Sequence, residues 1–205
     1  SNSVVLMKIK SYKKIFNIFS SSILIDKYIN QIDIVDPESI IPLIMKNIDY
    51  FNNILHVKVK GSDSEDLQNL IEKMESVNSI SFHDHPIDSF NNLSLLMGKN
   101  KIKSIGFDSS LTKSSLNSFL QIPNVKNLNY LRISNLHNFP ISSLISYLTR
   151  LSYLSLNSCN LSIGNVLEKI IQSQMVFLKE LDLSGNLGNE FELKAKKKLF
   201  LPLQL

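Results

Sequence analysis

A short apolar motif recurs along the whole of this 205-residue chain. Its clearest copy spans 151–161, where Leu151, Leu154, Leu156, Cys159 and Leu161 fill the pattern L-x-x-L-x-L-x-x-N/C-x-L at every fixed position. More degenerate copies, with Ile, Val, Phe or Met in place of Leu, give starting points at 4, 29, 54, 77, 102, 128, 151 and 178. This even spacing predicts an array of stacked units, whose function is carried by a surface rather than by a catalytic centre.

Each copy predicts a strand followed by a helical segment. The central x-L-x-L-x stretch alternates apolar and polar residues, which is typical of a strand with one buried face. The segments that follow carry apolar residues at helical spacing over 40–51, 67–74, 141–148 and 166–171. Gly164 comes just before the helix expected in the copy that begins at Leu151. The shorter intervals indicate that some of these segments are single turns or 3₁₀ pieces.

The motif resembles that of leucine-rich repeat proteins, and the resemblance covers nearly the whole chain. The copy over 151–177 is similar to the longer, helix-bearing repeats of the ribonuclease-inhibitor kind. The resemblance implies an α/β solenoid, a curved right-handed superhelix with a parallel β-sheet on its concave face and helices or 3₁₀ turns on its convex face. We therefore predict one domain over 1–205 with about eight repeats. We expect a piece of a longer array, because the C-terminal tail runs into a further apolar stretch at Leu203 and Leu205.

The ninth position of the motif is where the copies depart most from the family. The family usually has Asn or Cys there, whose side chain bonds the backbone of the turn. Ser and His can still form such a hydrogen bond, whereas Leu and Pro cannot do so in the same way. The eight copies have Tyr12, Pro37, Ser62, His85, Ser110, Leu136, Cys159 and Asn186.

Composition and charge limit the possible partners. The net charge of +4 is small for this length, and the densest basic run, over 194–198, has no interleaved aromatic residues, so we do not expect nucleic acid binding. No apolar stretch is long enough to span a bilayer, and neither end resembles a signal peptide. We expect Cys159, the single cysteine, to be a buried free thiol. These features favour an intracellular, cytoplasmic protein.

The polar positions of each predicted strand, the third, fifth, seventh and eighth of the motif, are expected on the concave face. Tyr130 and Tyr153 are neighbours in the third-position column, with Arg132 beside them and Asn157 in the next repeat. Tyr and Arg are enriched at the energetic centres of protein interfaces, so this cluster is our candidate protein-binding site. The alternative is that the two tyrosines stack only to cover the strand surface.

A second, basic patch is expected nearer the N-terminus. It contains Lys8, Lys10, Lys58 and Lys60, with His56 nearby and Asp33 between them in the columns. The more conservative interpretation is a solvated face, because lysine is a common way to keep a strand surface hydrated.

Catalysis and metal binding find little support in the residues. His83, Asp84 and His85 are consecutive, but the repeat register directs the two imidazoles in different directions and provides no third ligand. The sequence has no nucleophile elbow, Walker A motif or dinucleotide-type glycine-rich loop. We therefore expect no catalytic residue, no metal and no cofactor.

The function we expect is a non-enzymatic protein-interaction module, a scaffold or adaptor that binds a partner protein through its concave surface and takes no small-molecule substrate. One alternative is an enzyme-regulatory array, such as a GTPase-activating one. Arrays of that kind have a functional arginine in an N-terminal loop, whereas the only arginines here are Arg132 and Arg150. Another alternative is a structural spacer in a larger protein.

Overall fold

Eight parallel strands form a single sheet in the computed structural model, which describes residues 5–9, 29–61, 64–84, 87, 89–99, 101–137 and 139–187. The order of the strands in the sheet is their order in the chain. Six of them begin two residues after a predicted motif start. The strands are β1 (Val5–Ile9), β2 (Ile29–Ile34), β3 (His56–Lys60), β4 (Ser79–His83), β5 (Ser104–Asp108), β6 (Tyr130–Ser134), β7 (Tyr153–Asn157) and β8 (Glu180–Asp182).

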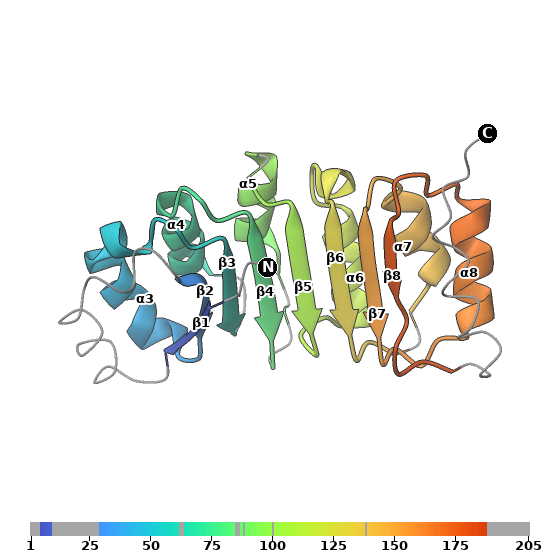
Figure 1. The fold of residues 1–205 in the computed structure, drawn as a ribbon, viewed down its shortest axis with the longest axis horizontal. Coiled ribbons are helices and arrows are strands. Elements are labelled where there is room, and N and C mark those ends of the chain that lie inside the picture. Colours follow the sequence, from blue (N-terminus) through green and yellow to red (C-terminus); the bar gives the residue numbers. More distant parts are fainter. Residues whose placement is uncertain are drawn as a thin grey trace.

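A helix follows each strand from β2 to β7. Figure 1 shows the strands side by side along an elongated molecule, with the helices of the central repeats behind the sheet. Two short 3₁₀ segments, η1 (Ile48–Phe51) and η2 (Val125–Asn127), lie between an α-helix and the next strand. They fall in the longer intervals that begin at 29 and 102, whereas the shorter intervals that begin at 54 and 128 contain α-helices over 65–73 and 141–147. The prediction that the shorter intervals have single turns or 3₁₀ pieces was therefore wrong. The helices are α3 (Pro37–Lys46), α4 (Glu65–Lys73), α5 (Asn91–Gly98), α6 (Lys113–Leu120), α7 (Ile141–Tyr147) and α8 (Ile163–Gln172).

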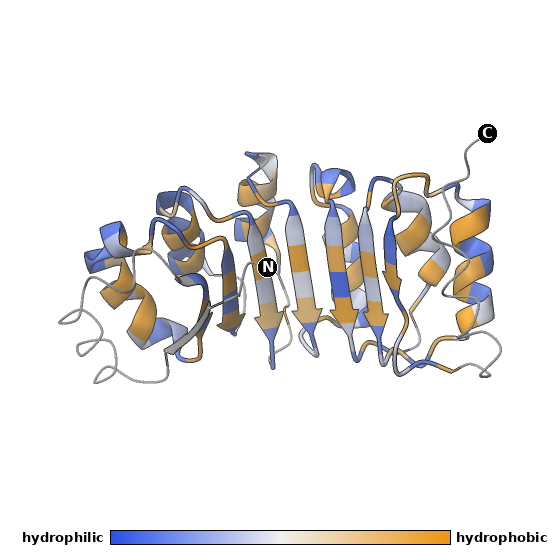
Figure 2. Ribbon diagram, viewed as in Figure 1, coloured by the Kyte–Doolittle hydropathy of each residue, from blue (hydrophilic) through white to orange (hydrophobic). Residues whose placement is uncertain are grey.

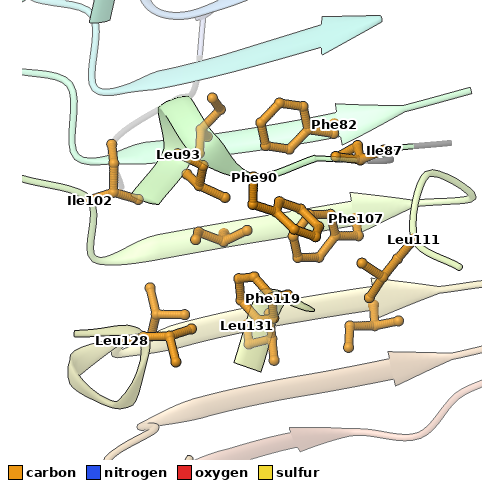
Figure 3. Packing of buried hydrophobic residues seen from close by; sticks show 14 of the residues in the cluster. Phe82, Ile87, Phe90, Leu93, Ile102, Phe107, Leu111, Phe119, Leu128 and Leu131 are labelled. Carbon is orange, nitrogen blue, oxygen red and sulfur yellow. The ribbon is translucent and has the colours of Figure 1, made fainter. Parts of the chain in front are cut away.

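The core lies between the sheet and the helices. Polar and apolar residues alternate along the strands, so that one face of the sheet carries the apolar side chains (Figure 2). Phe107 of β5 meets Phe119 of α6 edge to face at 5.0 Å between ring centroids, and stacks at 5.9 Å on Phe82 of β4 (Figure 3). Such contacts join each repeat to the next, so the core is continuous along the array.

A left-handed turn follows the strand in six consecutive repeats. It falls at the eighth position of the motif, where the backbone φ angle is positive. Positive φ is costly for most residues, but Gly, Asn and Asp tolerate it best. The residues are Gly61, Asp84, Ser109, Asn135, Ser158 and Gly185, with φ of 141°, 68°, 58°, 60°, 52° and 71°. The backbone conformation of this turn therefore repeats from copy to copy, although the residue type at the position varies.

The ninth-position side chains confirm the expected hydrogen bonds to the backbone. Each polar one reaches the carbonyl of the sixth-position residue one repeat earlier. Ser110 donates to Phe82 at 3.0 Å, Cys159 donates to Ile133 at 3.6 Å, and Asn186 donates to Leu156. Cys159 is buried, as predicted. We call this series of contacts the ninth-position ladder. Tyr12, Ser62 and His85 lie outside the described residues.

The position of Gly164 relative to its helix was also predicted wrongly. Gly164 lies inside α8, as its second residue, rather than before the helix, because Ser162 is the N-cap and accepts a hydrogen bond from the Asn165 amide. Of the apolar residues at helical spacing over 166–171, Val166 and Ile170 are buried, whereas Ile171 is 65% exposed. Among the described residues, no helix is both long enough and apolar enough to cross a membrane.

Candidate functional site

The strand pairing aligns the polar side chains of neighbouring repeats into rows across the sheet. We call the sheet face that carries them, opposite the core, the open face. The parallel register pairs third-position residues with one another, and likewise fifth-position residues. From β3 to β7, the third-position row is His56, Ser79, Ser104, Tyr130 and Tyr153, and the fifth-position row is Lys58, Ser81, Gly106, Arg132 and Ser155.

A hollow of about 410 Å³ lies where these rows contain only small residues. We call it the central hollow. Its floor is formed by Ser79 and Ser81 of β4 with Ser104 and Gly106 of β5. Its two sides are His56 and Lys58 on β3, and Tyr130 and Arg132 on β6, and Gln31, Phe107 and Asp108 complete the lining. The volume falls within the range of small ligand-binding pockets.

Gly106 keeps the centre of the floor low. A Cβ atom added there would lie 2.6 Å from the Ser81 hydroxyl oxygen, so even alanine would require that side chain to move. A larger side chain at this position would rise into the hollow between Lys58 and Arg132. The absence of a side chain at Gly106 therefore contributes directly to the shape of the site.

The two tyrosines of the predicted binding cluster stack face to face. Their ring centroids lie 4.1 Å apart, with an angle of 5° between the ring planes. Burial, and then the interaction with the Tyr153 hydroxyl, raises the pKa of Tyr130 to about 12, so its hydroxyl stays protonated at neutral pH. Only Tyr130 borders the central hollow, whereas Tyr153 packs against it from the β7 side.

The other two members of that cluster are separated by the structure. Arg132 is exposed on the wall of the hollow, and its Nε donates a hydrogen bond to the Ser134 hydroxyl at 3.3 Å. Asn157 does not line the hollow. Its Nδ2 donates to the Ser184 hydroxyl at 2.5 Å, and its Oδ1 accepts from Ser158 at 2.8 Å. The structure thus brings Tyr130 and Arg132 together and leaves Asn157 at the end of β7, where its side chain bonds Ser158 and Ser184.

The basic patch is also divided. The register places Lys8, Asp33 and Lys58 in one row, as the column analysis predicted. Lys58 lines the hollow, whereas Lys60 forms an ion pair with Asp84 at 3.4 Å. Lys10 lies outside the described residues.

His56 connects two serines of the hollow floor. Its Nδ1 lies 2.6 Å from the Ser79 hydroxyl, and its Nε2 lies 3.2 Å from the Ser81 hydroxyl. Burial, with a smaller effect from Lys58, lowers the pKa of His56 to about 4, so the ring is neutral at pH 7. A neutral ring donates through one nitrogen and accepts through the other. With both nitrogens occupied by serine hydroxyls, His56 fixes the positions of those side chains.

A buried acid–base pair lies beside the hollow. His83 Nε2 of β4 is 3.3 Å from Asp33 Oδ1 of β2, and His83 Nδ1 is 3.2 Å from Asp84 Oδ2. Asp33 and His83 are buried, with 4% and 8% of their surface exposed. The contact joins β2 to β4 across the intervening strand β3, at the base of the open face. Among the described residues, no group of three or more His, Cys, Asp or Glu side chains could hold a metal ion.

The hollow was not predicted, although the sequence contains a signal for it. Ser79, Ser81, Ser104 and Gly106 occupy adjacent places in two columns, and four small residues surrounded by larger ones indicate a depression. The His83–Asp33 contact had no comparable signal, because the repeat register does not align these two residues.

The fold and the site define the class of the protein as α/β, with one all-parallel sheet alternating with helices and one polar sheet face. No protein-family model matches the chain, and comparison with curated proteins gives no match. The function must therefore be inferred from the geometry of the open face.

Proposed function

We propose that the chain is a leucine-rich-repeat-type solenoid that acts as a non-enzymatic protein-interaction module and binds a partner protein through its open, concave face. The observation that carries this proposal is the pairing of Tyr130 and Arg132 on the wall of a polar hollow. The two residue types are enriched among the side chains that dominate binding energy at protein interfaces.

The order of the strands supports the solenoid. Doubly wound α/β sheets reverse their strand order at a switch point and carry helices on both faces. Here the order runs from β1 to β8 without reversal, and the open face carries polar side chains. The left-handed turn in six consecutive repeats and the ninth-position ladder add two further features with the same period.

The state of the tyrosine pair supports a binding role. A stacked, partly buried aromatic pair loses little side-chain freedom when a partner covers it, so its burial yields more binding energy than that of flexible side chains. The protonated Tyr130 hydroxyl also provides a hydrogen-bond donor at the edge of the hollow.

The test is an affinity capture that compares two matched double variants. Tyr130→Ala/Arg132→Ala removes a tyrosine and an arginine from the open face. Tyr147→Ala/Arg150→Ala removes the same two residue types from the end of α7 and the loop after it, where Tyr147 is 44% exposed and Arg150 is also exposed. Circular dichroism and thermal unfolding establish that both variants fold.

The bait is incubated with a lysate of the source organism. We expect the unaltered chain and the Tyr147/Arg150 variant to retain the same partner protein, and the Tyr130/Arg132 variant to lose it. Equal retention by both variants would contradict a binding role for the open-face cluster. No retained protein at all would favour the structural spacer.

A further inference from the structure

The open face carries two cations that face each other across the central hollow. Lys58 of β3 and Arg132 of β6 lie in the same fifth-position row, separated only by Ser81 and Gly106. Three strand spacings separate their backbones, about 14 Å. Because the two intervening residues are small, nothing in this row stands between the two long side chains.

Neither cation forms an ion pair with a described residue, although Asp33 is the neighbour of Lys58 in the fifth-position row. Lys60, two positions along β3, pairs with Asp84 at 3.4 Å, and His83 has Asp33 and Asp84 as neighbours. In contrast, neither Lys58 nor Arg132 has a carboxylate within ion-pair distance in the described part of the chain, and Arg132 bonds only the Ser134 hydroxyl. Cations outside ion pairs on both sides of a pocket favour an anionic ligand.

The rest of the lining can also bind an anion. The Ser104 hydroxyl is a potential donor, and so is the one of Ser79 and Ser81 that accepts from the neutral His56 ring, since the other donates to that ring. Tyr130 keeps its proton at neutral pH. Asp108 is the one carboxylate of the lining, and it belongs to the seventh-position row, beside His83 and Ser134. Its negative charge repels an anion at that end of the hollow, so the favoured position for an anionic group is beside the third- and fifth-position rows.

We propose that the central hollow receives an acidic peptide segment of the partner protein, with a carboxylate side chain held between Lys58 and Arg132 and the adjacent peptide chain against Tyr130. This inference rests on the proposed function and specifies the chemistry of the partner. An extended segment of about six residues, roughly 20 Å long, crosses the hollow from one cation to the other.

Fluorescence anisotropy with a labelled peptide tests this proposal. The probe alternates glutamate with alanine over about six residues, and the control peptide has glutamine in place of glutamate. We expect the acidic probe to bind, with affinity that falls when salt is raised from about 50 to about 300 mM, and the glutamine peptide to bind at least about tenfold more weakly. Equal binding of the two peptides would overturn the proposal.

Single substitutions locate the site. Lys58→Gln and Arg132→Gln should each weaken binding about fivefold, and Asp108→Asn should strengthen it about twofold by removing a repelling charge. Arg150→Gln is the matched control and should leave affinity unchanged. A loss with Arg150→Gln as large as that with Arg132→Gln would mean non-specific attraction to a basic protein, and would overturn the site.

A further variant blocks the hollow without changing its charge. Ser104→Tyr places a third tyrosine beside Tyr130 in the third-position row, where the ring would fill the hollow. We expect at least a tenfold loss of peptide binding with an unchanged circular dichroism spectrum. Undiminished binding in a folded Ser104→Tyr variant would overturn the placement in the hollow. Inorganic phosphate that displaces the probe as effectively as unlabelled acidic peptide would identify a small-anion site instead.

The affinity capture separates this inference from the proposed function. A partner that depends on Tyr130 and Arg132 but is insensitive to Lys58→Gln and to excess acidic peptide would preserve the proposed function and overturn the acidic segment. Displacement of that partner by the acidic peptide, and not by the glutamine peptide, would support both.

Discussion

The turn after β8 and the turn after β6 occupy equivalent places in two repeats, yet they are stabilised differently. In the turn after β8, the Asn186 side chain donates to the Leu156 and Leu183 carbonyls and accepts from the Cys159 and Leu161 amides at 2.9 and 3.0 Å. In the turn after β6, the same position holds Leu136, which is 5% exposed and belongs to the apolar core.

This difference explains how the motif can degenerate without loss of the fold. One turn is stabilised by satisfying buried backbone groups and the other by burying an apolar side chain. Each contribution is of the order of 1–3 kcal/mol. The parallel strand register and the left-handed eighth-position turn are the same in both repeats. Two different contributions therefore stabilise the same backbone turn, and exchanging the residues measures how far each turn depends on its own contribution.

The largest effect is expected from Asn186→Leu. The substitution leaves the Leu156 carbonyl and the Cys159 and Leu161 amides without their side-chain partner, and should lower the free energy of unfolding by about 3 kcal/mol. Urea denaturation measures this value. Asn165→Leu, on an exposed position of α8, is the control and should change stability little. A loss below about 1 kcal/mol would mean that apolar burial alone suffices at this turn.

The reverse exchange, Leu136→Asn, should cost less, about 2 kcal/mol. The chain loses the burial of a leucine and regains about one hydrogen bond, from the new amide to the Phe107 carbonyl one repeat earlier. Urea denaturation of both variants under the same conditions ranks the two substitutions by their loss of unfolding free energy. If Leu136→Asn were the more costly, the turn after β6 would depend on its apolar contacts more than the turn after β8 depends on its hydrogen bonds.

Ser110→Ala sharpens the comparison at a third turn. Ser110 is fully buried and donates to the Phe82 carbonyl at 3.0 Å. Removing the hydroxyl leaves that buried carbonyl without this donor and should cost about 1.5 kcal/mol. Ser118→Ala on the exposed side of α6 should be nearly neutral in the same urea experiment. Equal stability of the two variants would contradict a structural role for the ladder hydroxyl.

The smallest effect is expected from Cys159→Ser. The thiol donates to the Ile133 carbonyl at 3.6 Å, and a serine hydroxyl should make the contact that Ser110 makes in its own repeat, with a change in stability of less than about 1 kcal/mol. Thermal unfolding under reducing conditions provides the measurement. A loss of several kcal/mol would show that sulfur packing matters more at this turn than hydrogen bonding.

The strands and the buried apolar positions were predictable because they depend on a local alternation of residues. Leu154 and Leu156 identify β7 by themselves, and the repeat spacing extends the assignment to degenerate copies such as Ile105 and Phe107. The eighth-position turn was not predicted, since Gly, Asp, Asn and Ser share only a general preference for turns.

The candidate site was predictable only in part. The columns placed Tyr130 next to Tyr153 and Arg132 because neighbouring strands pair in register. They could not show that Tyr153 packs behind Tyr130, since side-chain rotamers decide that. The His83–Asp33 contact was also beyond a column analysis, because it joins strands that are not neighbours.

The uninterrupted order of the parallel strands also determines the spacing of the side chains that the open face presents. Within one row, neighbouring strands present side chains at intervals of about 4.8 Å, whereas every second side chain of an extended peptide recurs at about 6.7 Å. An extended peptide that crosses the strands therefore cannot place a side chain opposite every strand, because the two spacings already differ by about 1.9 Å at the first step. Under the proposed function, a peptide would be recognised by a few repeats only, and a longer array would offer more binding positions rather than tighter binding at any one of them.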